Sequence, residues 1–232
     1  MECEESLSLH FSLGWVQSTM HLGSPDDLVL DYTRMMMGFL LFKPDAGRIA
    51  LIGLGGGSLA KYCFRYVPLS SFTAVEIDAE VIALRDKFQI PQDGRRFRVV
   101  QADGVEFVTR RNQKFDVLML DAFDAHGLAP AMCTQDFYDH CFTQLYDGGI
   151  LVANFLNDDE KFGTYISKIR ESFDDQVVTI EACDNGNKIA FAFKGKDFPP
   201  PPASLRDRAI ELNKHHSVNF HEAATKLSCR LL

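Results

Sequence analysis

The sequence predicts an α/β fold, in which a doubly wound, mostly parallel sheet of seven strands follows a small N-terminal β-hairpin cap. The first observation is an unbroken apolar run at 49–52 that leads into Gly-Leu-Gly-Gly-Gly at 53–57. Such a short run fits a strand that is buried on both faces. The second is the alternation of apolar and amphipathic segments between residues 48 and 194, with crossovers long enough for right-handed βαβ units.

The residues before position 45 are expected to form the cap. Loose alternation over 7–22 predicts two short strands around Gly14, and residues 28–30 predict a third strand. Apolar spacing over 32–42 predicts a buried helix, which Pro44 ends. We therefore divide the chain into a cap and helix at 1–44, a main domain at 45–198, and a Pro-rich spacer with C-terminal helices at 199–232.

Seven strands and five helices are expected in the main domain. The strands are placed at 48–53, 72–77, 97–101, 115–120, 149–154, 177–182 and 188–194, and the helices at about 57–66, 79–88, 104–111, 134–146 and 160–173. Asn185-Gly186, between the last two strands, is typical of a hairpin turn. Five parallel strands followed by an antiparallel hairpin match the seven-stranded, Rossmann-like sheet of the methyltransferase type rather than the six-stranded dinucleotide-binding sheet.

Composition narrows the classes of partner. The formal net charge of −8 over 232 residues argues against a nucleic-acid partner and is compatible with cationic substrates such as amines. The six cysteines show neither a C-x-x-C pair nor zinc spacing, so we expect free thiols in a reducing cytoplasm and no metal. No apolar run reaches the ~18 residues of a membrane span, and the acidic start lacks the positive charge of a signal peptide.

The Gly-rich loop is the first candidate ligand site. Glycine permits positive φ and lets the main chain approach a ligand, and the helix that follows points its N–H groups and positive dipole end at the same place. Glu76 ends the next strand, where a carboxylate accepts two hydrogen bonds from a ribose diol. The alternative is an ordinary strand, loop and helix with a surface glutamate. On the nucleoside interpretation the contacting residues of the loop are Gly53, Gly55, Gly56, Gly57 and Ser58.

Carboxylates also stand after the next two strands. Ligands of open α/β sheets bind outside the carboxyl ends of the strands, where the strand order reverses. Asp103, followed by Gly104, can accept a hydrogen bond from an adenine amino group, and Asp121 lies beside the crossing point, nearest the reacting centre. Asp78 is expected to be the N-cap of the helix at 79–88.

The combination of motifs resembles that of the spermidine synthases, which are polyamine aminopropyltransferases on a methyltransferase-type fold. The resemblance spans about residues 15–195, and it is carried by the glycines at 53–57, Val75-Glu76-Ile77-Asp78, Ala102-Asp103-Gly104 and the segment 115–124. It implies an in-line displacement, in which an amine attacks a carbon bonded to the sulfonium of decarboxylated S-adenosylmethionine and methylthioadenosine leaves. Asp121 would position the amine and act as its general base.

The resemblance also implies a set of binding residues. Gln17 resembles a glutamine that contacts the nucleoside, although an exposed strand glutamine is the alternative. Asp124 either binds a second ammonium group or caps the turn at 125–127, and the loop 121–134, in which His126 is expected to be exposed, is placed to close over the site. The residues expected to contact the donor are Gln17, Gly53, Gly55, Gly56, Gly57, Ser58, Glu76, Ile77, Asp103, Gly104 and Ala122.

Two departures from the family pattern leave alternatives open. Ser58 stands where the family usually carries an acid facing the donor's ammonium group, so charge no longer excludes the carboxylate of full S-adenosylmethionine. A segment that supplies polyamine-pocket residues and dimer contacts is shortened after residue 30, which leaves the acceptor amine and a homodimer undecided. An S-adenosylmethionine-dependent methyltransferase and a non-catalytic nucleoside-binding protein are therefore the alternatives to an aminopropyltransferase.

Overall fold

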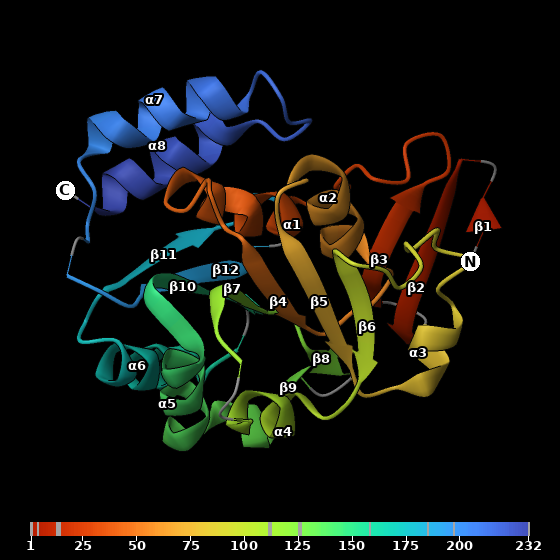
Figure 1. Ribbon diagram of the computed structural model, residues 1–232, viewed down its shortest axis with the longest axis horizontal. Coiled ribbons are helices and arrows are strands. Elements are labelled where there is room, and N and C mark those ends of the chain that lie inside the picture. Colours follow the sequence, from red (N-terminus) through yellow and green to blue (C-terminus); the bar gives the residue numbers. More distant parts are fainter. Residues whose placement is uncertain are drawn as a thin grey trace.

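The computed structural model describes residues 2–3, 5–12, 15–110, 113–124, 127–157, 159–184, 186–196 and 198–231, with backbone alone for 2–3, 11–12, 15, 124 and 202. A seven-stranded sheet forms its centre (Figure 1). The strands are β4 (Arg48–Ile52), β5 (Ser71–Glu76), β6 (Phe97–Gln101), β7 (Phe115–Leu120), β10 (Leu145–Phe155), β11 (Val177–Glu181) and β12 (Lys188–Phe193).

The strand order is β11-β12-β10-β7-β4-β5-β6, and β12 runs antiparallel to both of its neighbours while the other neighbouring pairs are parallel. This confirms the predicted fold class, including its C-terminal antiparallel hairpin. The chain runs from β4 outward to β6 and then returns to β7 on the other side of β4. The order therefore reverses between β4 and β7, which is where open α/β sheets bind their ligands.

Helices cover both faces of the sheet, so successive side chains of β4 enter different cores. Ile49 and Leu51 belong to one core, whereas Ala50 and Ile52 belong to the other. The first core is covered by α1 (Asp31–Met36), η1 (Met37–Leu41), α2 (Ser58–Tyr66), α7 (Pro202–Leu212) and α8 (Phe220–Arg230), and the second by α4 (Gly104–Thr109), α5 (Gln135–Gln144) and α6 (Phe162–Ser172). This double burial explains the unbroken apolar run in the sequence.

The N-terminal cap is a separate antiparallel sheet of β1 (Glu2–Cys3), β2 (Ser6–Ser12) and β3 (Trp15–His21), which Figure 1 shows at the end of the molecule away from α7 and α8. The hairpin expected over 7–22 is confirmed, but the third strand expected at 28–30 is wrong. The guanidinium of Arg34 donates to the carbonyls of Leu28 (3.1 Å) and Val29 (2.8 Å). A side chain thus satisfies the acceptors that a partner strand would have used.

Two expected helices are shorter or less regular than the sequence suggests. The helix expected over 32–42 is α1 followed by the 3₁₀ helix η1, and the helix expected over 79–88 ends early, as α3 (Ala79–Ala83). After Ala83 the backbone continues in turns, in which the N–H groups of Leu84 and Arg85 donate to the carbonyls three residues back, and Gln89 has a positive φ of +54°.

The C-terminal helices confirm the expected helical segments after the prolines, and they pack on the first core of the sheet. Among the helices that the structure describes, none is both long and apolar enough to cross a bilayer. The division at 1–44, 45–198 and 199–232 stays a proposal.

Candidate active site

Gly53 follows β4 and packs directly against the residue that follows β7. Its φ of +96° is left-handed, and a Cβ atom there would lie 2.2 Å from the carbonyl oxygen of Asp121. Glycine is required because no side chain fits at that distance. The N–H of Gly53 donates to the carbonyl of Val75 at 2.8 Å, and the N–H of Asp121 donates to that of Ile52 at 2.9 Å. The loop therefore begins in contact with β4, β5 and β7 together.

The rest of the Gly-rich loop packs against β3 of the cap. A Cβ atom at Gly56 would lie 2.5 Å from Ser18 Oγ, and the side chain of Gln17 lies 3.8 Å from the equivalent position at Gly55. Ser58 Oγ and Ser18 Oγ are 3.1 Å apart. The fold thus brings Gln17 and Ser58, two of the expected site residues, to the same loop.

The carboxylate of Glu76 ties the Gly-rich loop to the end of β5. Its Oε2 accepts the N–H of Leu54 at 2.9 Å, and its Oε1 accepts the N–H of Asp78 at 3.0 Å. An ionised carboxylate has about four acceptor positions, so capacity remains for a diol. Ile77, the next residue, is 64% exposed, which is unusual for an isoleucine that follows a buried strand.

Asp103 and Asp78 both begin helices. Asp78 Oδ1 accepts a backbone N–H at 2.8 Å and caps α3 as expected, whereas the cap that Asp103 Oδ1 forms on the N–H of Val105 at 2.7 Å is not anticipated by the sequence analysis. Capping uses one of the two oxygens of Asp103. A Cβ atom at Gly104 would lie 2.4 Å from Ile52 Cγ2, so the start of α4 lies against the end of β4.

Asp121 is held by side chains from two other elements. Asn154 Nδ2, at the end of β10, donates to Asp121 Oδ1 at 2.9 Å, and the hydroxyl of Tyr32 in α1 donates to Oδ2 at 3.2 Å. Asn187 Nδ2 in turn donates to Asn154 Oδ1 at 3.0 Å. Both asparagines are buried. This network, which we call the Asp121 network, fixes the direction in which the carboxylate points.

The environment of Asp121 changes its basicity. Part of the side chain stays exposed, yet desolvation by the surrounding protein raises the pKa of its carboxyl group, and the hydrogen bonds from Asn154 and Tyr32 oppose that rise. Desolvation and the nearby Asp121 charge raise the pKa of the Tyr32 phenol well above its usual value, so Tyr32 stays a neutral donor at physiological pH. Asp121 is therefore an oriented carboxylate that binds a proton more readily than a surface aspartate does.

The residues after Asp121 lead into a small hairpin of β8 (Phe123–Asp124) and β9 (Gly127–Leu128). Ala122 is half-buried, and its Cα lies 3.1 Å from the Cβ position at Gly53. Only the backbone of Asp124 is described, so its expected contact with an ammonium group stays a prediction. His126 lies outside the described residues.

Sequence reasoning does not identify Tyr32 or Asn187 as site residues, and it gives Asn154 no role beyond its place after the fifth strand. Tyr32 lies 89 positions from Asp121, so no local pattern links the two residues. The available signal is a tyrosine at the start of an apolar helix, because a buried phenol usually finds a hydrogen-bond partner.

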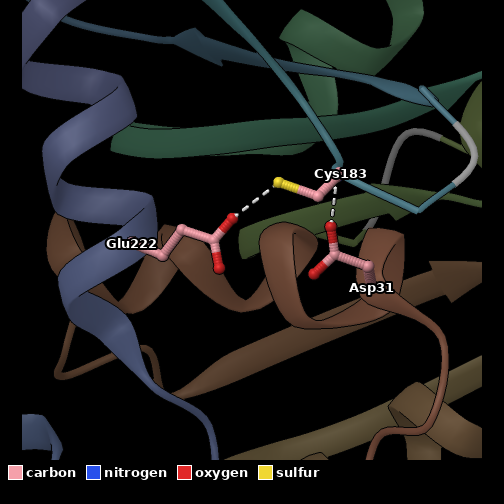
Figure 2. Close-up of side chains that lie close together, drawn as sticks. All are labelled: Asp31, Cys183 and Glu222. Carbon is pink, nitrogen blue, oxygen red and sulfur yellow. Dashed lines mark hydrogen bonds between the residues drawn. The ribbon is translucent and has the colours of Figure 1, made fainter.

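One cluster within the described residues has the composition of a metal site. The ligand atoms of Asp31, Cys183 and Glu222 lie within 4.8 Å of one another, and Figure 2 shows them approaching from α1, the β11–β12 connection and α8. Lys226 Nζ, however, lies 3.1 Å from Cys183 Sγ and 3.0 Å from Glu222 Oε1, and Arg34 pairs with Asp31 at 3.3 Å. These cations already neutralise the cluster, so we interpret it as a contact that holds α8 against α1.

The sheet order, with the Gly-rich loop at its switch point, defines an α/β protein of the methyltransferase type. Solved structures agree. Human methyltransferase-like protein 13 in complex with SAH superposes with a TM-score of 0.72 at 20% identity, covering 80% of this chain and 91% of that one. A probable spermidine synthase from Corynebacterium glutamicum gives 0.70 at 21% identity, covering 92% and 84%.

The sequence places the chain within that class. Residues 29–178 match the spermine/spermidine synthase domain model. A polyamine aminopropyltransferase of Chromobacterium violaceum is 36% identical over 221 residues, which cover 95% of this chain and 85% of the relative. The chain therefore belongs to the spermine/spermidine synthase family of enzymes, as its motifs suggest.

Proposed function

We propose that this protein transfers the aminopropyl group of decarboxylated S-adenosylmethionine to an amine of a polyamine. The observation that carries the proposal is the Asp121 carboxylate, held by Asn154 and Tyr32 and raised in pKa, at the sheet edge where Gly53 and Glu76 also lie. Membership of the spermine/spermidine synthase family supports it. A reducing cytoplasm as its location and self-association as a homodimer stay predictions.

The donor is proposed to lie across the switch point. The free acceptor positions of Glu76 bind the ribose diol, and the oxygen of Asp103 that does not cap α4 accepts from the adenine amino group. The exposed side chain of Ile77 covers the purine, and Gln17 and Ser58 border the tail of the donor beside the glycines. The main chains of Gly53, Gly55, Gly56, Gly57, Gly104 and Ala122 are proposed to contact the donor, whereas the positions of the missing Cβ atoms at Gly53, Gly56, Gly57 and Gly104 face other protein atoms.

The transfer step needs a free amine, because a primary amine with a pKa near ~10 is mostly protonated at neutral pH. Asp121 accepts that proton, and its raised pKa makes it a better acceptor than an ordinary aspartate. The amine nitrogen then forms a bond to the carbon next to the sulfonium. The carbon–sulfur bond breaks with its electron pair going to sulfur, which leaves neutral methylthioadenosine. Asp124 is proposed to bind a second ammonium group of the acceptor.

The test follows both products by mass spectrometry. The protein is incubated with decarboxylated S-adenosylmethionine and a diamine, and we expect equal amounts of methylthioadenosine and an aminopropylated amine. The Asp121→Asn variant serves as the background. If the parent protein releases methylthioadenosine no faster than this variant does with any of a panel of diamines and polyamines, the result would favour the non-catalytic alternative.

A second candidate is a methyltransferase of the same fold, which one observation favours. Position 58 carries a neutral hydroxyl, 3.1 Å from that of Ser18, so it brings no charge that would repel the carboxylate of full S-adenosylmethionine. Replacing decarboxylated S-adenosylmethionine by S-adenosylmethionine in the same assay separates the two candidate functions. Methylation of the amine by S-adenosylmethionine, without aminopropyl transfer, would select the methyltransferase.

A further inference from the structure

The second feature that could bind a ligand lies at the opposite edge of the sheet, where the strands begin. A cavity of about 160 Å³ opens among the first residues of β4, β5, β6 and β7. Strands of five to six residues are roughly 17–20 Å long. The cavity is therefore separate from the Gly-rich loop, Glu76 and Asp121. Its polar lining is Arg48, Ser71, Thr73, Arg95, Arg96 and Arg98.

The four arginines give this cavity a positive charge that the protein itself does not cancel. The lining residues include no aspartate or glutamate, and within the described ranges none of the four guanidinium groups forms an ion pair with a carboxylate. The nearby acids have other partners: Asp93 pairs with Arg85 at 2.7 Å, and Asp116 accepts the N–H groups of Gly47 and Arg48. Four such charges in a chain of net charge −8 are unlike its surface as a whole.

Neutral groups fix three of these arginines in place. Arg98 Nε donates to Thr73 Oγ1 at 3.0 Å, and Arg48 donates to the hydroxyl of Tyr146 at 3.3 Å. The guanidinium of Arg96 lies 4.6 Å from the ring centroid of Phe64. Such contacts orient a guanidinium without neutralising it, so the site is preorganised for an anion.

We propose that this cavity binds a phosphate-class oxyanion, either inorganic phosphate or the phosphoryl group of a small metabolite. Arginine presents paired N–H donors that match phosphate oxygens, and the Thr73 hydroxyl, which accepts from Arg98 Nε, adds a neutral donor. With a volume of about 160 Å³, the cavity has room for a phosphate-sized group together with a few waters.

The test is calorimetric titration of the full chain with inorganic phosphate and with glycerol phosphate, at constant pH and ionic strength. We expect saturable binding of at least one of them. A comparison of the two affinities shows whether the site prefers the free ion or the ester. The double variant Arg95→Gln, Arg98→Gln should weaken that binding at least tenfold. Arg206→Gln, an exposed arginine of α7, removes the same kind of charge elsewhere and should leave the binding unchanged.

Thermal unfolding without phosphate shows whether the double variant is folded. If it is not, the single variant Arg95→Gln replaces it, because Arg95 is exposed and its loss should still weaken binding several-fold. Equal affinity in parent and variants, equal loss in Arg206→Gln, or binding only to a long polyanion such as heparin would overturn the proposal.

Discussion

The two edges of the central sheet carry opposite charges. At the carboxyl ends of neighbouring strands stand Glu76, Asp103 and Asp121, and at the amino ends stand Arg48, Arg95, Arg96 and Arg98. The acidic edge suits the sulfonium donor and the amine of the proposed reaction, whereas the basic edge suits an anion. The formal net charge of −8 does not show this division, because it sums the charges of both sites, which lie at opposite ends of the same strands.

The largest effect should come from the acidic edge. Replacing Asp121 by asparagine keeps its size but removes the proton acceptor, so we expect transfer to slow by about 10²–10⁴-fold. Donor affinity should change little, because Glu76 and Asp103 carry the proposed contacts to the nucleoside. Single-turnover rates and donor titrations measure the two quantities. Equal losses in both would show that Asp121 only binds.

The contact between β4 and β7 can be broken without touching a charge. Gly53→Ala should destabilise the fold by about 3 kcal/mol or more, because strain at positive φ adds to a clash with the carbonyl of Asp121. Gly163→Ala is the matched control. Gly163 lies in α6 with nothing within 4 Å of its Cβ position, so alanine there should be neutral or slightly stabilising. Urea unfolding of both variants checks this, and similar losses would contradict the structure at Gly53.

Glu76 tests the part of the acidic edge that we assign to the donor. Glu76→Gln should weaken donor binding by roughly 1.5–3 kcal/mol, because the ribose diol loses a charged acceptor. Asp78→Asn, two residues on, should leave the affinity unchanged, since asparagine caps α3 as well as aspartate does. Calorimetric titration with methylthioadenosine measures the affinity of both variants. A weaker affinity in Asp78→Asn alone would move the ribose site away from Glu76.

The smallest expected effect is a shift in pH dependence. Activity needs the Asp121 carboxylate, so it should fall as the pH drops through the raised pKa of that group. The hydrogen bond from Tyr32 lowers this pKa, so Tyr32→Phe should move the acidic limb of the kcat/KM profile to higher pH. Tyr146→Phe, at the basic edge, should leave the limb in place. If the acidic limb of the kcat/KM profile lies at the same pH in Tyr32→Phe as in the parent protein, another group takes the proton.

The sequence predicts those parts of the molecule that depend on local pattern. The apolar run before Gly53 predicts β4, and the acids that follow the strands predict one shared edge, which the sheet order confirms. Asp78 was predictable as a cap because its role is settled within two residues.

What the sequence does not predict depends on distant partners. Leu28 and Val29 look like a strand, yet the Arg34 side chain takes their carbonyls. Tyr32 and Asn187 join the Asp121 network only after the sheet has formed, and the four arginines share a cavity only because parallel strands begin side by side. Asp103 lies between these two cases. The sequence predicts its position after a strand, but not the helix cap that its carboxylate forms.

On the proposed function, Gly53, Glu76 and Asp121 surround one decarboxylated sulfonium nucleoside. The decisive experiment is calorimetric titration of the parent protein with decarboxylated S-adenosylmethionine and with S-adenosylmethionine. We predict tighter binding of the decarboxylated donor, because its net charge is one unit more positive than that of the full donor and the strand ends that bind it carry Glu76, Asp103 and Asp121. Tight binding of S-adenosylmethionine together with weak binding of the decarboxylated form would contradict the account.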